Sequence, residues 1–71
     1  MTIKEAQKII SSLGGKNNLT DDEEFEYTEA LSFLIQETAD PRYMMELGGY
    51  YYGLRSFDLA LKYYDMAAEL G

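Results

Sequence analysis

The sequence predicts an all-α protein of four helices that pair as two antiparallel helical hairpins. Apolar residues recur at helical spacing along most of the chain, and no stretch alternates apolar and polar residues for long. Three short breaks divide the chain, and the only proline, Pro41, stands at the second of them. Short connections make successive helices antiparallel, so four segments give two hairpins. A length of 71 residues allows one domain, residues 1–71.

The first helix is expected over residues 2–13, where apolar residues fall on one side of a helical wheel. These residues are Ile3, Ala6, Ile9, Ile10 and Leu13. The sequence GGKNN follows at residues 14–18. Paired glycines readily adopt the left-handed conformation that ends many helices, so we expect them to terminate this one.

The second helix is expected over residues 21–39. Thr20 and Glu23 have the spacing of a capping box, in which the Thr20 hydroxyl accepts from the Glu23 amide and the Glu23 side chain reaches back. Acidic residues in the first turn also suit the positive end of the helix dipole. The expected inner stripe comprises Tyr27, Leu31, Leu34, Ile35 and Thr38.

The third helix, residues 41–52, follows Asp40, a favourable N-cap, and has Pro41 as its first residue. Residues 53–55 then turn the chain. Ser56 caps the fourth helix, residues 57–70, and Gly71 occupies the place of a C-terminal cap.

The third and fourth helices carry a spaced set of small and aromatic residues. These are Leu47, Gly48, Tyr51, Ala60, Tyr64 and Ala67, with Met44 three residues before Leu47. The set resembles the tetratricopeptide repeat, a helix–turn–helix unit of 34 residues with the pattern W-x2-L-G-x2-Y and then A-x3-F. The ending KYYDMAAELG is also similar to the Sel-one-like relatives of that family. Arg55 departs from the pattern, since the family usually has glycine there.

The resemblance implies a right-handed stack of helix pairs, with residues 1–40 as a degenerate first hairpin and 41–71 as the better match. It also implies a protein-interaction module that holds a peptide or partner helix in a concave groove. Family members that bind peptide carboxylates use several basic and asparagine residues. Here only Arg42 is basic among the groove-facing places, and Gly49 takes the asparagine place, so we do not predict carboxylate binding.

The stretch ELGGYYYG, residues 46–53, combines glycine and tyrosine inside a predicted helix. Glycine weakens a helix interior by about 1 kcal/mol relative to alanine, so each glycine requires a reason. On the wheel, Gly48 falls on the core side, where we expect it to let the fourth helix approach closely. Tyr50 and Tyr51 are expected to fill the space on either side of it.

The opposite arc of the third helix is the predicted partner-binding surface. Gly49 and Gly53 line up four residues apart and form a smooth strip beside an adaptable thioether and a flat ring. The predicted partner-binding residues are Arg42, Met45, Gly49, Tyr52 and Gly53. The alternative is that the first or second helix of the same chain covers this strip.

The fourth helix has only a narrow polar stripe, and its apolar arc is far wider than one neighbour requires. A further repeat would dock on one of its flanks. The predicted self-association residues there are Leu59, Tyr63, Met66 and Leu70. We expect a second copy to cover this flank in a symmetric homodimer, and the alternatives are the first helix or another protein.

Acidic residues crowd the second helix and no basic residue interrupts them. They are Asp21, Asp22, Glu23, Glu24, Glu26, Glu29, Glu37 and Asp40. A solvated helix face is the common meaning of such a run. The functional alternative is an acidic docking face for a basic protein, formed by Glu26, Glu29, Phe33 and Glu37. A further alternative is an acidic decoy that mimics nucleic acid and inhibits an enzyme that handles it.

Composition narrows the remaining functions. The chain has no histidine and no cysteine, and its net charge is −7. The usual general base and the usual zinc ligands are therefore missing, so we expect no enzyme activity, no metal and no cofactor. Direct binding of nucleic acid requires a basic footprint, and a membrane span requires about 20 apolar residues, so we predict neither. We expect a cytoplasmic location, which the absence of cysteine suits.

Overall fold

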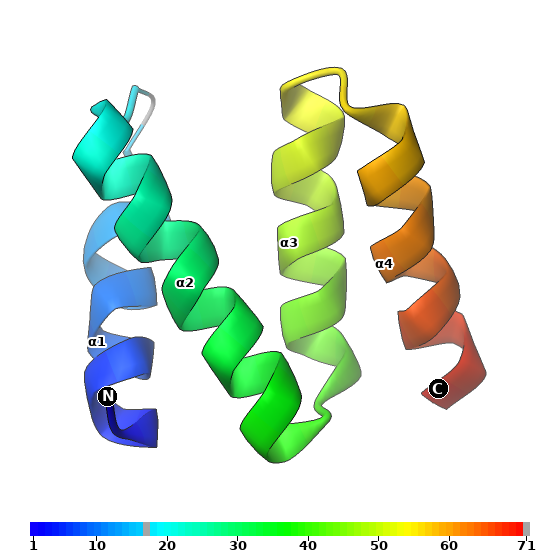
Figure 1. The fold of residues 1–71 in the computed structure, drawn as a ribbon, viewed down its shortest axis with the longest axis horizontal. Helices are drawn as coiled ribbons and strands as arrows, with labels where there is room; N and C mark the ends of the chain where they lie inside the picture. The colour runs from blue at the N-terminus through cyan, green and yellow to red at the C-terminus, as the bar shows by residue number, and fades with distance from the viewer. Residues whose placement is uncertain (17, 71) are drawn as a thin grey trace.

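The computed structural model describes residues 1–16 and 18–70 and contains four helices in that part of the chain. They are α1 (Ile3–Leu13), α2 (Asp21–Thr38), α3 (Pro41–Gly53) and α4 (Phe57–Leu70). The predicted all-α class is confirmed, and the predicted helix boundaries agree to within one residue. The predicted cap at Gly71 lies outside the described residues. Successive helices run in opposite directions (Figure 1).

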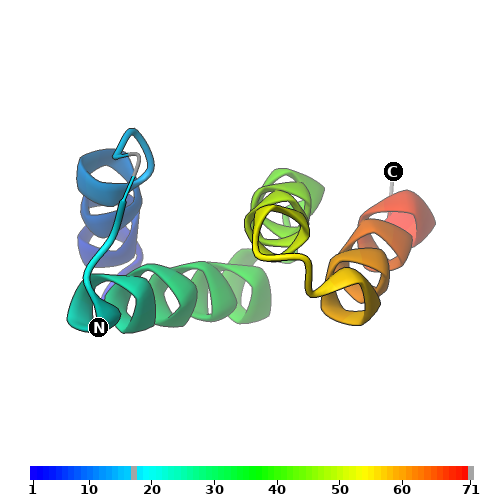
Figure 2. The ribbon, with the colours of Figure 1, turned by 90° about the horizontal axis from the view of Figure 1, so that it is seen from above.

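The helices form an open row and not a closed bundle. Among the described residues, α1 packs on α2, α2 on α3 and α3 on α4, and the backbones of α1 and α4 do not approach each other. Seen from above, α1 and α3 stand on the same side of α2 (Figure 2). The molecule measures 29 × 27 × 15 Å, so it is only about as thick as two packed helices. The helix at the end of the row, α4, therefore has one neighbour.

The core lies mainly between α1 and α2, with one contribution from α3. It consists of Ala6, Ile10, Leu13, Tyr27, Ala30, Leu31, Leu34 and Leu47. Most of the predicted inner stripes are buried there, but Ile3 and Thr38 are exposed. Thr38 is exposed because it serves the helix end: its hydroxyl donates to the Leu34 carbonyl at 2.7 Å and accepts from the Asp40 amide at 3.2 Å.

Capping boxes begin the first two helices. In α2 the Thr20 hydroxyl accepts from the Glu23 amide at 3.2 Å, and the Thr20 amide donates to the Glu23 carboxylate at 3.0 Å, as predicted. Thr2 and Glu5 make the same pair of bonds at the start of α1. Thr2 is therefore the cap of α1 and not its first residue.

The predicted left-handed glycines are wrong. Gly14 ends α1 in a right-handed conformation, and no described glycine has a positive φ. Gly14 is needed for space instead, because a Cβ there would lie 2.7 Å from the Ile10 carbonyl oxygen. The left-handed residues are Ala39 (φ 54°) and Arg55 (φ 63°), which follow α2 and α3. That conformation costs a residue other than glycine about 1 kcal/mol.

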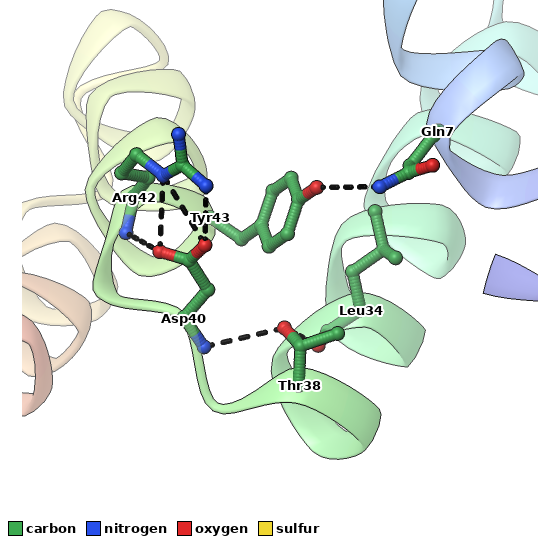
Figure 3. Close-up of polar contacts among 6 residues, drawn as sticks. All are labelled: Gln7, Leu34, Thr38, Asp40, Arg42 and Tyr43. Carbon is green, nitrogen blue, oxygen red and sulfur yellow. Dashed lines mark hydrogen bonds and ion pairs between the residues drawn. The ribbon is translucent and has the colours of Figure 1, made fainter. Parts of the chain in front are cut away.

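The connection between α2 and α3 is fixed by short polar contacts (Figure 3). The Asp40 carboxylate accepts from the Arg42 amide at 2.9 Å and pairs with the Arg42 guanidinium at 2.8 Å. Asp40 is thus the predicted N-cap of α3. Nearby, the Gln7 side-chain amide donates to the Tyr43 hydroxyl at 3.2 Å and ties α1 to α3. These contacts hold the start of α3 in place relative to α1 and the end of α2.

Gly48 provides the close approach of α3 and α4 that the sequence predicted. It is buried, and a Cβ built on it would lie 3.0 Å from the Tyr64 ring and 3.3 Å from the Ala60 carbonyl oxygen. The residues of α4 that are buried against α3 are the small Ala60 and Ala67. A side chain at position 48 would therefore separate the two helices.

Replacement of Gly48 by leucine is expected to lower the free energy of unfolding by about 2 kcal/mol, because overpacking a tight contact costs that much. Urea unfolding followed by circular dichroism measures the change. Gly49→Leu is the matched control. Gly49 follows Gly48 in the chain but is exposed, and a Cβ on it would meet only the Tyr64 hydroxyl, at 3.6 Å. The control should be as stable as the parent or more so, since leucine is the better helix former. Equal losses in both variants would contradict the account.

Candidate functional site

A cleft of about 430 Å³ opens where the end of α1, the following loop and α2 face α3. Its lining residues are Leu13, Gly14, Lys16, Asn18, Leu19, Glu24, Tyr27, Glu46, Gly49, Tyr50, Gly53 and Leu54. The cleft exists because α3 packs on α2 but stands apart from the loop between α1 and α2, which we call the N-terminal loop. Two predicted partner-binding residues, Gly49 and Gly53, form part of its wall.

The glycine strip of α3 is open. A Cβ on Gly53 would meet no atom within 4 Å, and one on Gly49 would meet only Tyr64. The alternative that α1 or α2 covers the strip is therefore wrong, because these elements supply the facing wall of the cleft. Met45 and Tyr52 are exposed beside the strip, and the Arg42 guanidinium is held by Asp40 at the start of the helix. None of these three is among the described lining residues.

The three consecutive tyrosines of α3 point in three directions. Tyr50 faces α2, with its ring centre 5.4 Å from that of Tyr27. Tyr51 faces α4 and stacks on Tyr63 at 5.9 Å. Tyr52 faces the turn into α4, 5.4 Å from Phe57. One helix thereby carries aromatic contacts to both of its neighbours and still exposes a ring to solvent.

Carboxylates and phenols share the cleft. Lys16 pairs with Glu23 at 2.6 Å, which leaves Glu24 and Glu46 without an ion-pair partner among the described residues. Burial raises the pKa of Glu46 above the ordinary value for glutamate. Burial first, and then the negative charge of Glu46, raises the pKa of Tyr27. The cleft therefore combines two acidic groups with the edge of an aromatic pair.

The predicted self-association flank of α4 is partly covered. Leu59 and Leu70 are exposed, Leu70 to 56%, whereas Tyr63 and Met66 are half-buried. Tyr63 is half-buried because it stacks on Tyr51. The alternative that α1 covers this flank is wrong, since the backbone of α1 does not reach α4.

A second apolar flank of α4 was not predicted as a site. Phe57, Leu61 and Tyr64 are exposed there, Leu61 to 62%. We call these three residues, together with Met45 and Tyr52 of α3, the α3–α4 patch. The helical spacing of Phe57, Leu61 and Tyr64 could have revealed it, because the three residues follow one another at intervals of four and three.

The acidic face of α2 differs from the prediction at its aromatic residue. Phe33 is half-buried and packs against the core, whereas Phe25 is 66% exposed. Phe33 stands three residues after the buried Ala30, and so shares its side of the helix. Phe25 is four residues from Asp21 and from Glu29, so the wheel could have placed it on the acidic side. Glu26, Glu29 and Glu37 are exposed as expected.

Two further features concern the described residues, 1–16 and 18–70. No three acidic side chains gather closely enough to hold a metal ion. None of the four helices combines the length and the apolar character needed to cross a membrane.

Comparisons with known proteins give no relative. No protein-family model matches the chain, and no curated protein or solved structure is significantly similar to it.

Alkaline titration tests the aromatic pair at the cleft. Because the pKa of Tyr27 is raised, the folded protein keeps this proton at a pH where the unfolded chain releases it. The contribution of Tyr27 to stability should therefore be constant below about pH 10 and fall above it. Circular dichroism against pH should show that Tyr27→Phe stays folded to a higher pH than the parent. The exposed Tyr52→Phe should not differ from the parent, and equal midpoints in all three would contradict the interpretation.

Proposed function

We propose that the protein is a small protein-binding module that holds a partner helix or peptide across the open side of α3 and the α3–α4 patch. The main support for the proposal is that several large apolar side chains are exposed near the strip formed by Gly49 and Gly53 of α3. Tyr52 is 61% exposed and Leu61 62%, and a Cβ on Gly53, the residue after Tyr52, would meet no atom within 4 Å. Exposed apolar patches on small proteins commonly mark interaction sites.

Continuity of the surface supports one binding site. Tyr52 contacts Phe57 edge to face, and the Tyr64 hydroxyl lies 3.6 Å from the Cβ position of Gly49. The patch therefore continues onto the glycine strip, and the strip continues into the cleft. A partner helix could set its backbone against Gly49 and Gly53 and its apolar side chains on the patch.

We interpret the helix order as a tetratricopeptide-like stack, with residues 1–40 as its first hairpin and 41–71 as its second. The placement of α1 and α3 on the same side of the row supports this interpretation (Figure 2). In such a stack the first helix of each pair lines the binding side. The remaining flank of α4, with Leu59 and Leu70, is proposed to pair with a second copy of the chain.

The second candidate function is an acidic decoy for an enzyme that handles nucleic acid. The exposed carboxylates of α2 around Phe25 favour it. This function would use the outer face of α2 and not the strip of α3. Its binding would depend on the attraction between exposed charges, which salt screens.

A peptide-display selection against the immobilised protein tests the proposal. Selected helical peptides should carry apolar residues at helical spacing and should still bind at about 1 M salt, where exposed charges are screened within about 3 Å. Gly49→Trp fills the strip and should weaken binding at least tenfold, about 1.4 kcal/mol.

The matched control is Ser32→Trp, which places the same bulk on the exposed outer face of α2. It should leave peptide binding unchanged. No enrichment of peptides would contradict the binding module. Sensitivity of Ser32→Trp together with loss of binding in salt would favour the acidic decoy instead.

A further inference from the structure

We infer that the cleft between the N-terminal loop and α3 receives a lysine or arginine side chain of the partner. This inference rests on the proposed function and names the chemistry of its partner. The cleft presents two carboxylates, Glu24 from α2 and Glu46 from α3. Its only basic lining residue among those described is Lys16, and Glu23 already pairs with that ammonium at 2.6 Å.

The two acidic groups are separated along the chain but line the same cleft as one aromatic pair. Tyr27 and Tyr50 line the same cleft, with ring centres 5.4 Å apart. The charge of Glu46 acts on the Tyr27 hydroxyl, and the charge of Glu24 acts on the Tyr50 hydroxyl. Both carboxylates and both rings therefore line the cleft that the guest would enter.

Glu46 is exposed at the mouth of the cleft, and no described cation replaces the water that the neighbouring residues displace from it. Burial is the cause that raises its pKa, and no described lysine or arginine pairs with it. Loss of hydration disfavours the charged form unless a cation or hydrogen-bond donor replaces the water. A bound ammonium or guanidinium group would supply that replacement.

The remaining walls suit the stem of a long basic side chain. Leu13, Leu19 and Leu54 are apolar, and Gly49 and Gly53 leave the backbone bare for a close approach. Lysine and arginine place methylene groups on apolar surface and keep the charged end on polar groups. The tyrosine rings add attraction for a cation.

Long-range electrostatics favour the same partner. The chain carries a net charge of −7, so its field attracts basic proteins and repels acidic ones. An apolar partner residue would leave Glu24 and Glu46 without compensation in the cleft. A basic side chain followed by apolar residues would satisfy the cleft and the α3–α4 patch together.

Titration with n-butylammonium, observed by NMR on the complete chain, tests the cleft without any peptide. The amide signals of Gly14, Gly49 and Gly53 should shift, and n-butanol, which has the same stem without the charge, should shift them far less. Glu46→Gln should weaken butylammonium binding about tenfold, since a hydrogen bond to a charged group contributes that much. This variant should fold, because position 46 is exposed and glutamine is a good helix former.

Glu37→Gln is the control, as it removes an exposed carboxylate of α2 that does not line the cleft. It should bind butylammonium like the parent. Equal shifts with n-butanol, or equal losses in both variants, would overturn the inference.

The peptides selected above separate this inference from the proposed function. Replacement of their lysine by norleucine should weaken binding at least tenfold in the parent and have little effect in Glu46→Gln. If peptides bind tightly at the strip and norleucine has no effect, the binding module stands and the basic-residue site is wrong. If butylammonium binds and no peptide does, the cleft accepts cations and the protein-binding function is wrong.

Discussion

Gly48 determines how α4 is attached, and the exposed surface follows from that attachment. Because position 48 has no side chain, α4 lies close to α3 and buries its small residues Ala60 and Ala67 there. The large residues on both sides of this narrow contact, such as Leu61 and Leu70, extend past α3 into solvent. In this row α3 is the only helix packed on α4 among the described residues, so no second helix covers them.

Two tyrosines of α3 hold this helix against both of its neighbours, α2 and α4. Tyr50 and Tyr51 fix α3 to α2 and to α4 through ring contacts of 5.4 and 5.9 Å. The third side of α3, with Gly49 and Gly53, has only the Tyr64 hydroxyl beside it and opens on the cleft. A helix held firmly on two sides and bare on the third is a rigid platform, which lowers the entropy cost of binding a partner.

Local signals in the sequence are enough for the helices. Thr20 with Glu23, and Asp40 with Pro41, mark helix starts through hydrogen bonds made within a few residues, so spacing alone places them. Gly48 could also be predicted, because its core-side position left close approach as the main reason for glycine. The conformations of Gly14, Ala39 and Arg55 could not, since they depend on how the chain leaves each helix.

The cleft was beyond the reach of sequence patterns. It depends on where the loop after α1 lies relative to α3, and no periodicity encodes that distance. The aromatic residue of the acidic face was misplaced for a related reason: the packing of α1 on α2 decides that Phe33 is half-buried and that Phe25 is exposed. A helical wheel locates the apolar and acidic stripes of a single helix. The angle at which a second helix packs on it decides which of those stripes is buried.

Solvent access to individual leucine methyl groups would show whether α4 keeps its large apolar residues in water. A neutral paramagnetic agent in the solvent, added to dilute protein, broadens methyl NMR signals according to their exposure. We expect strong broadening for Leu61 and Leu70 and almost none for Leu31, Leu34 and Leu47, which are fully buried. If Leu61 and Leu70 proved as protected as Leu47 in the monomer, α4 would be covered by its own chain, and the proposed binding surface would not exist.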